Sequence, residues 1–94
     1  KIMSCKKDHT ELSKIMTSIP TDQGGVGRHK CAACAYKIGY EAGYNLNGNI
    51  NINSVLENLE ESQAGAQRHK SPHAAFALGY YEGICKRTNK NNNL

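Results

Sequence analysis

The chain has 94 residues and a formal net charge of +4, with 12 Lys and Arg against 8 Asp and Glu. This length predicts one small domain that spans residues 1–94. The modest positive charge favours anionic partners, but it is far below the charge of a dedicated basic arm. No apolar run approaches the roughly 20 residues that a membrane span needs, so we expect no membrane partner.

The expected cellular location follows from the N-terminus and the cysteines. The opening KIMSCKKDHT contains no apolar core of a signal peptide. An even number of cysteines could form disulfides in a secreted protein, but nothing else in the sequence indicates secretion. We therefore expect a cytoplasmic protein whose thiols are reduced.

The first half of the chain reads as an arm, a helix, a loop and a second helix. Residues 1–9 form the arm, and Thr10 is placed to cap the first helix, which Pro20 ends. The loop PTDQGGVG leads to a second helix, which we expect to begin at Cys31 and to run to about Tyr44. The apolar positions of the first helix have helical spacing and are Leu12, Ile15, Met16 and Ile19.

The second half repeats this order after an asparagine-rich joint. Asn51 or Asn53 is placed to cap a third helix, which the loop ESQAGAQ follows. Ser71 is a natural N-cap for a fourth helix, and Pro72 suits the first helical position because that position needs no backbone donor. Residues 86–94 are expected to fray. The apolar face of the third helix consists of Ile52, Val55, Leu56 and Leu59.

An internal duplication organises the chain. Residue i aligns with residue i+40 without a gap from Leu12 to Tyr44. We interpret this as two tandem units, residues 10–44 and 50–85, and two like units usually pack about a twofold axis. The predicted fold is therefore all-α, with two helix-loop-helix units about a pseudo-twofold axis. The identical pairs include Arg28 with Arg68, His29 with His69, Lys30 with Lys70, Gly39 with Gly79, and Gly43 with Gly83.

Small residues form a stripe along the second and fourth predicted helices. Glycine inside a helix costs about 1 kcal/mol relative to alanine, so glycines at matched positions need a compensating reason. Close approach of the two helices supplies one, because small residues let the backbones come near each other. Contact with a ligand is the alternative. The stripes recur at every fourth position and consist of Ala35, Gly39 and Gly43, and of Ala75, Gly79 and Gly83.

A duplicated Arg-His-Lys triad precedes each of these two helices. Cationic side chains are unfavourable at a helix N-terminus, which carries about half a positive charge and unsatisfied N–H donors. A bound phosphate or carboxylate would resolve the conflict, and nearby glycines would let the backbone approach it. The predicted ligand-binding residues are Gln23, Gly25, Arg28, His29 and Lys30, their counterparts Gln63, Gly65, Arg68, His69 and Lys70, and Tyr40 and Tyr80, which could stack on bases.

Two questions about this predicted anion site stay open. The triads could instead be solvated, or their Arg and Lys side chains could bind loop carbonyls or Asp22, Glu60 or Glu61. The second question is whether the site is single. If the helix N-termini meet, both triads line one pocket that suits two phosphates. If the helices run antiparallel, a helix of about 14 residues separates the triads by about 21 Å, which suits a polymer.

Cysteine and histidine spacings predict a metal site in the first half of the chain. Cys5 and His9 have C-x3-H spacing, and Cys31 and Cys34 form a C-x2-C pair. Together they make a Cys3His set, which suits a closed structural zinc site. The second unit lacks both cysteines of the pair, so zinc would be an addition to one half and not the shared function.

A thioredoxin-like dithiol is the alternative use of Cys31 and Cys34, because a helix N-terminus lowers the pKa of a thiol. The βαβ pattern that such a motif requires does not occur in the sequence. Cys85 is expected to be a buried apolar residue. His73 is expected to cap its helix or to face solvent.

We therefore interpret the chain as a binding domain for a phosphate-rich ligand, either nucleic acid or a nucleotide, with structural zinc as the one expected cofactor. No residue is predicted to be catalytic, since no acidic residue is duplicated and no nucleophile motif occurs. Two alternatives stay open. One is a module that contacts acidic residues of a protein partner, and the other is an enzyme in which His29 and His69 cleave a phosphodiester as an acid–base pair. A homodimer that completes the core also stays open.

Overall fold

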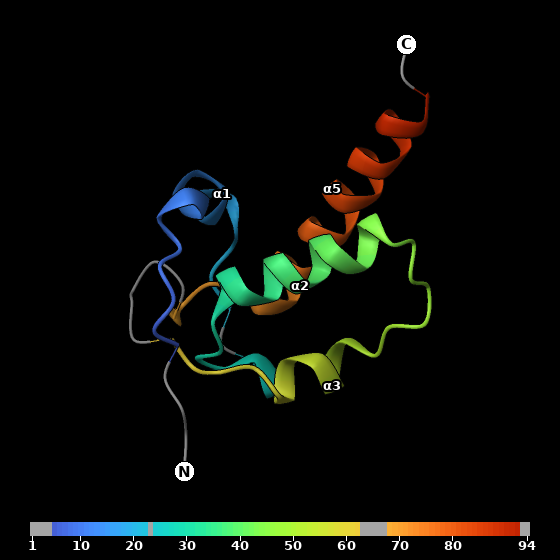
Figure 1. Ribbon diagram of the computed structural model, residues 1–94. Coiled ribbons are helices and arrows are strands. Elements are labelled where there is room, and N and C mark those ends of the chain that lie inside the picture. Colours follow the sequence, from blue (N-terminus) through green and yellow to red (C-terminus); the bar gives the residue numbers. More distant parts are fainter. Residues whose placement is uncertain (1–4, 23, 63–67, 93–94) are drawn as a thin grey trace.

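The computed structural model describes residues 5–22, 24–62 and 68–92, and most of these residues are helical (Figure 1). Within these ranges β-structure is limited to isolated bridges between the two loops. The all-α fold class predicted from the sequence is therefore confirmed. The elements in chain order are η1 Thr10–Leu12, α1 Ser13–Ser18, η2 Gly25–Gly27, α2 Ala32–Tyr44, α3 Ile52–Glu57 and α5 Pro72–Asn92.

Side chains cap two helices where the sequence predicts them. α5 follows Ser71, whose hydroxyl oxygen accepts a hydrogen bond from the Ala74 N–H at 3.0 Å. Asn51, rather than Asn53, caps α3, and its side-chain oxygen accepts from the Ser54 N–H at 3.2 Å. Both caps satisfy a backbone donor that the helix itself leaves without a partner.

The first helix begins differently from its prediction. Thr10 is not its cap: it opens η1, and His9 holds the cap position. The Thr10 N–H and hydroxyl both donate to Asp8 Oδ1, at 3.0 and 2.5 Å, so an aspartate earlier in the chain supplies the acceptor. α1 ends before Ile19, which has the extended backbone expected of a residue that precedes proline.

α5 is longer than the sequence indicated. We expected residues 86–94 to fray, but the helix continues to Asn92. Arg87 ties this part of α5 to the end of α2, because its Nη1 donates to the Tyr44 carbonyl oxygen at 2.6 Å and its guanidinium lies 5.6 Å from the centroid of the Tyr44 ring. The last turns of α5 project beyond α2 (Figure 1). No helix in the described ranges combines the length and apolar character that a membrane span requires.

The glycine stripes of α2 and α5 face each other. A Cβ atom on Gly39 would lie 2.3 Å from the carbonyl oxygen of Phe76, and one on Gly79 would lie 2.2 Å from that of Tyr36. A methyl group cannot fit at these distances, so only glycine permits such close contact of the two backbones. The prediction that the stripes serve helix packing is confirmed.

The register of the glycine contacts sets the direction of the two helices. A Cβ atom on Gly43, one turn after the first contact, would lie 2.1 Å from the carbonyl oxygen of Tyr80, and one on Gly83 would lie 2.1 Å from that of Tyr40. Moving from Gly39 to Gly43 toward the C-terminus of α2 therefore moves the contact from Phe76 to Tyr80, toward the C-terminus of α5. The helices therefore run in the same general direction, and their N-termini lie together.

The core joins the short helices to the α2–α5 pair. Met16 of α1 and Leu56 of α3 are almost completely buried, and in the view of Figure 1 the two helices lie above and below α2. Cysteines and alanines at the start of α2 belong to the same buried cluster, so the core adjoins the predicted metal site. The buried cluster consists of Leu12, Met16, Ile19, Cys31, Ala32, Ala33, Cys34, Ala35, Tyr36, Leu56, Ala75 and Phe76.

The loops that lead into α2 and α5 cross each other. The Cys31 N–H, at the start of α2, donates to the Glu60 carbonyl oxygen at 2.9 Å, and the Ser71 N–H, at the start of α5, donates to the Pro20 carbonyl oxygen at 2.7 Å. Each helix start is therefore held by the loop that precedes the other long helix. This crossing brings the two triads to the same end of the molecule.

Candidate functional site

Four side chains from two separate segments meet beside the start of α2. Cys5 comes from the arm, His9 precedes η1, Cys31 is the N-cap residue of α2 and Cys34 lies in its first turn. Their candidate ligand atoms all lie within 4.8 Å of one another. The structure thus brings together all four residues of the predicted metal set, in what we call the Cys3His cluster.

The distances within the Cys3His cluster fit a tetrahedral metal ion. The His9 Nε2 atom lies 3.3, 3.5 and 3.6 Å from the Sγ atoms of Cys5, Cys31 and Cys34, and the Cys5 and Cys34 sulfurs are 3.6 Å apart. Bonds from zinc of about 2.3 Å to sulfur and about 2.0 Å to nitrogen give a tetrahedron with edges of about 3.5 to 3.8 Å. The observed spacings agree with these edges.

The cluster suits a closed structural site. All of its cysteines are free thiols, and the spacing of the Cys5 and Cys34 sulfurs is far greater than the about 2.05 Å of a disulfide bond. His9, Cys31 and Cys34 are buried, and Cys5 is half-buried. Four protein ligands around one ion leave no open position for a substrate, which distinguishes structural from catalytic zinc sites.

The two cysteines of the C-x2-C pair hold their protons unequally. A hydrogen bond from the Cys34 side chain, aided by the Cys34 backbone N–H and the charge of His9, lowers the pKa of Cys31 to about 5. The same hydrogen bond, together with burial, raises the pKa of Cys34. Cys31 is completely buried, so its thiolate is poorly placed for exchange with another thiol and well placed to bind a metal.

The orientation of His9 agrees with binding through Nε2. This nitrogen faces the three sulfurs, whereas Nδ1 is buried and has no hydrogen-bond partner among the described residues. Neutral histidine carries its proton on one ring nitrogen only, so binding through Nε2 leaves the proton on Nδ1. In metal sites this second nitrogen normally donates to a carboxylate, a carbonyl or a water molecule.

A metal in the Cys3His cluster would fasten the arm to the loops. The Cys5 N–H donates to the Glu61 carbonyl oxygen at 2.6 Å, and Glu61 forms an isolated β-bridge with Lys30. Cys5 therefore lies against Glu61 of the second half of the chain, although all four ligands belong to the first half. Metal binding would stabilise this crossing of segments.

The second candidate site is the place where the two triads meet. The rings of His29 and His69 approach edge to face, with centroids 6.2 Å apart. Arg68 Nη2 lies 3.2 Å from His29 Nδ1, and Arg68 Nη1 donates to the Ser62 carbonyl oxygen at 3.1 Å. His29 and Gly25 have left-handed φ angles of 62° and 69°, which is uncommon for a residue other than glycine. We call His29, His69 and Arg68 the paired-loop junction.

The surroundings of His29 favour its neutral form. Loss of hydration lowers the pKa of His29, and the charges of Arg68 and Arg28 lower it further. Neutral His29 can accept at Nδ1 from Arg68 and still carry a proton at Nε2. A bound anion would oppose the arginine charges and shift His29 toward its protonated form.

The remaining predicted ligand-binding residues differ in their hydrogen bonds and in their exposure. Lys30 Nζ donates to the carbonyl oxygens of Glu57 and Leu59, at 3.2 and 2.9 Å, so it closes the C-terminal end of α3. This is the role at loop carbonyls that the sequence left open. Arg28 is exposed and Lys70 is half-buried. Outside the described residues lie Gln23, Gln63 and Gly65.

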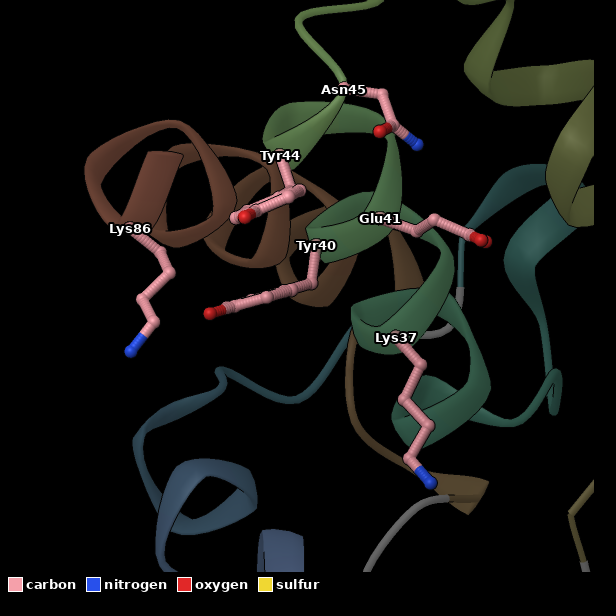
Figure 2. Close-up of a pocket in the computed structure, with 6 residues that line it drawn as sticks. All are labelled: Lys37, Tyr40, Glu41, Tyr44, Asn45 and Lys86. Carbon is pink, nitrogen blue, oxygen red and sulfur yellow. The ribbon is translucent and has the colours of Figure 1, made fainter. Parts of the chain in front are cut away.

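The two predicted stacking tyrosines have different surroundings. The Tyr80 hydroxyl donates to the Asn47 carbonyl oxygen at 2.9 Å, and the Tyr80 ring stacks on Phe76. Tyr40 lies in a groove of about 560 Å³ (Figure 2). Sequence reasoning did not single out the other groove residues, although a second tyrosine one turn after Tyr40 was an available signal. These residues are Lys37, Glu41, Tyr44, Asn45 and Lys86.

No protein-family model, no curated protein and no solved structure matches this chain. Its function therefore has to be inferred from its own residues. The Cys3His cluster, the paired-loop junction and the groove beside Tyr40 are the features that support an inference.

Proposed function

We propose that this chain is a zinc-stabilised helical domain that binds a phosphate-bearing ligand, a nucleotide or a nucleic acid backbone, at the paired-loop junction. The approach of the His29 and His69 rings to 6.2 Å, beside Arg68, is the observation that carries the proposal. Basic side chains from two loops converge there, at the starts of two helices. Such convergence suits a single site for neighbouring phosphate groups.

The residues of the junction, and Arg28 beside His29, each have a role in this proposal. Arg28 and Arg68 bind phosphate oxygens in bidentate geometry, and His29 and His69 donate hydrogen bonds. The positive ends of the α2 and α5 dipoles favour the same negative charge. The Lys30 ammonium group already donates to the carbonyl oxygens of Glu57 and Leu59. The arginines and histidines therefore contribute more to the affinity for phosphate than this lysine does.

The contacts between the loops support the finer proposal that the chain is a tandem duplication with pseudo-twofold packing. The Ser62 N–H donates to the His29 carbonyl oxygen at 2.9 Å, and the Asp22 N–H donates to the His69 carbonyl oxygen at 3.2 Å. Under the alignment of residue i with residue i+40, Asp22 corresponds to Ser62 and His29 to His69, so the two hydrogen bonds are equivalent. The glycine contacts between α2 and α5 are reciprocal in the same way. A ligand near such an axis would receive like groups from each unit.

Zinc is structural in this proposal. It would hold the arm and the start of α2 through the Cys3His cluster, and Cys31 follows His29 closely in the chain. The zinc site would therefore fix the loop that carries one half of the junction. The reducing cytoplasmic location that we propose would keep the thiols available to the metal.

Phosphodiester cleavage is a second candidate function, and the meeting of His29 and His69 favours it. Two histidines at this spacing could act as acid and base, because neutral His29 can take up a proton while its neighbour gives one. Incubation with labelled RNA, followed by gel analysis, separates the candidates. Cleavage that His29→Gln and His69→Gln each abolish would support catalysis, whereas intact RNA would leave binding alone.

A thermal-shift screen tests the proposed binding function. The zinc-loaded protein is mixed with short DNA, short RNA, mononucleotides, cyclic nucleotides and sulfate, and wild type is compared with Arg28→Ala/Arg68→Ala. A ligand at about 100 times its dissociation constant stabilises the folded state by about 2.7 kcal/mol. We expect one class of anion to raise the Tm of wild type and not that of the double variant. No shift with any anion would contradict the proposal and favour an acidic protein partner.

A further inference from the structure

A groove along α2 lies apart from the paired-loop junction. Tyr40 and Tyr44 line it together with Lys37 and, across from them, Lys86 of α5. Figure 2 shows both tyrosine side chains extending from α2 toward the side where Lys86 lies, whereas Glu41 extends away from them. We call Tyr40, Tyr44, Lys37 and Lys86 the tyrosine groove. Its volume of about 560 Å³ is typical of a small-ligand site.

Both tyrosine rings have a neighbouring side chain against them. Arg87 binds the Tyr44 carbonyl oxygen at 2.6 Å and lies over the Tyr44 ring at 5.6 Å. The Tyr40 ring lies 6.1 Å from the ring of Tyr36, whose hydroxyl donates to Glu82 at 2.5 Å. Rings that pack against neighbours lose less conformational entropy than free rings do when a planar ligand stacks on them.

The exposed charges that line the groove are mixed, with a positive excess: Lys37 and Lys86 are cationic, and Glu41, whose side chain extends away from the tyrosines, is anionic. Lys37 and Lys86 are both exposed. The only ion pair among the described residues joins Lys37 to Glu11 at 3.6 Å, with both side chains exposed, and such pairs contribute little stability. The Lys37 ammonium group can therefore exchange this carboxylate for a phosphate. Ordered aromatic rings beside ammonium groups are the combination that binds unpaired bases and their phosphates.

A second groove continues the first along α2. It has a volume of about 290 Å³, shares Tyr40 and Lys37 with the tyrosine groove, and is also lined by Tyr36. Tyr40 and Tyr44 follow one another at single-turn spacing, about 6 Å along the helix axis, whereas Tyr36 is only 6% exposed and belongs to the core. Two accessible rings in succession suit neighbouring bases of a strand better than one isolated base.

We propose that the tyrosine groove binds unpaired bases of single-stranded nucleic acid, with Tyr40 and Tyr44 stacking on the bases and Lys37 and Lys86 contacting the phosphates. The inference rests on the proposed function for the class of ligand and deepens it, because it specifies single strands rather than mononucleotides or duplexes. Bases inside a duplex must be unstacked before a protein ring can reach their faces.

Fluorescence anisotropy with the zinc-loaded full chain tests this proposal. The labelled probes are oligothymidine, oligouridine, an abasic oligonucleotide of the same length and a duplex. The first two separate DNA from RNA as the source of the single strand, and the abasic strand retains phosphates without bases. Stacking on one base should make the abasic probe and the duplex bind at least about fivefold more weakly than the better single strand.

Variants of the groove locate the binding. Tyr44→Ala should weaken binding of the better single strand by about fivefold or more, while Tyr44→Phe, which keeps the ring, should stay within about twofold of wild type. Lys86→Gln should reduce the slope of log affinity against log salt concentration by about 0.7. Tyr81→Ala is the matched control, because Tyr81 is 65% exposed on α5 and does not line the groove.

The outcomes separate this inference from the proposed function. If Arg28→Ala/Arg68→Ala weakens binding while Tyr44→Ala and Lys86→Gln bind as wild type does, the tyrosine groove is overturned and the junction stands. If the groove variants weaken binding and the arginine variant does not, the groove stands without the junction. No binding of any probe overturns both. If Tyr44→Ala does not fold, the salt dependence of Lys86→Gln decides alone.

Discussion

His29 and His69 meet edge to face at the paired-loop junction, with ring centroids 6.2 Å apart and planes at 82°. Nothing in the local sequence of either loop specifies this contact. It follows from α2 and α5, which run in the same direction because their glycine stripes face each other, and from the loops that cross before them. Helix packing thus creates the place where we propose that phosphate binds.

The first prediction concerns the pH dependence of anion binding. The pKa of His29 is lowered by loss of hydration and by Arg68 and Arg28, so the free protein favours the neutral form of this residue. A bound anion favours the protonated form and therefore raises its pKa. Affinity should increase as the pH falls from about 8 to about 6, through the ordinary range of histidine.

Sulfate is the appropriate ligand for this measurement, because it does not titrate in that range as phosphate does. Its dissociation constant can be followed by the Tm as a function of sulfate concentration at each pH. His29→Gln/His69→Gln should remove the pH dependence, and His73→Gln, outside the junction, should retain it. Sulfate affinity that does not change with pH in wild type would contradict the assigned role of the histidines.

The second prediction is that the folded chain holds a single zinc ion in the Cys3His cluster. Metal analysis of protein purified without chelators should show it, and cobalt in its place should give the visible absorption bands of a tetrahedral thiolate site. Removal of the metal should lower the Tm, since binding free energy at such a site is also folding free energy. Zinc affinity should decrease as the pH is lowered, because the thiols must lose their protons to bind the metal.

Cysteine variants provide the control for the zinc prediction. Cys34→Ala should lose zinc and lower the Tm as chelation does. Cys85→Ser should keep the metal content of wild type, because Cys85 lies far along α5 and is not a member of the cluster. A wild-type protein that binds neither zinc nor cobalt would refute the site.

The third prediction tests the close contact of α2 and α5. Gly43→Ala places a methyl group 2.1 Å from the Tyr80 carbonyl oxygen, so the helices must separate and the free energy of unfolding should fall by more than about 2 kcal/mol. Gly48→Ala is the matched control, because no atom lies within 4 Å of its added Cβ, and it should change stability by less than about 1 kcal/mol. Urea unfolding measures both, and equal effects would exclude the assigned packing.

The fourth prediction concerns stability at high pH. Burial, then the hydrogen bond to Glu82, raises the pKa of the Tyr36 hydroxyl. A folded-state pKa above the unfolded value of about 10 means that stability is fully present below that pH and is lost as the pH rises through the folded-state value. Tyr36→Phe should cost about 1 kcal/mol or more near neutral pH by removing the bond to Glu82.

The pH dependence of that cost distinguishes it from a packing defect. Above about pH 10 the wild type should lose stability faster than Tyr36→Phe, because phenylalanine cannot ionise. Tyr40→Phe is the control, since it alters a neighbouring ring on α2 without removing the bond to Glu82. Parallel stability curves for wild type and Tyr36→Phe would argue against the assigned hydrogen bond.

Local chemistry made much of the fold predictable from the sequence. Ser71 and Asn51 are strong caps, and the Cys3His set has familiar ligand spacing, so each could be recognised without knowledge of its surroundings. The role of the glycines could be predicted because glycine destabilises a helix, and close packing against a second helix compensates for this loss. The start of the first helix was predicted wrongly because Thr10 donates to Asp8 instead of capping, and neither η1 nor α1 has a side-chain cap.

The sequence left open that Lys30 binds loop carbonyls, but which carbonyls it binds depends on how the loops meet and could not be predicted. Lys30 binds carbonyl oxygens at the end of α3, which lie far from it in the sequence. The tyrosine groove also needs Lys86 of α5 beside Tyr44 of α2, and the sequence contains no signal for that pairing. Distant contacts of this kind depend on the register of the two long helices.

NMR of the histidine side chains tests the central proposal most directly. The zinc-loaded protein, labelled with nitrogen-15, is titrated with a short 5′-phosphorylated oligonucleotide, in wild type and in Arg28→Ala/Arg68→Ala. We predict that the ring signals of His29 and His69 shift together and saturate in wild type, remain in place in the double variant, and leave the His73 signal unchanged. Saturating binding that leaves His29 and His69 unmoved would contradict the assignment of the paired-loop junction as a phosphate site.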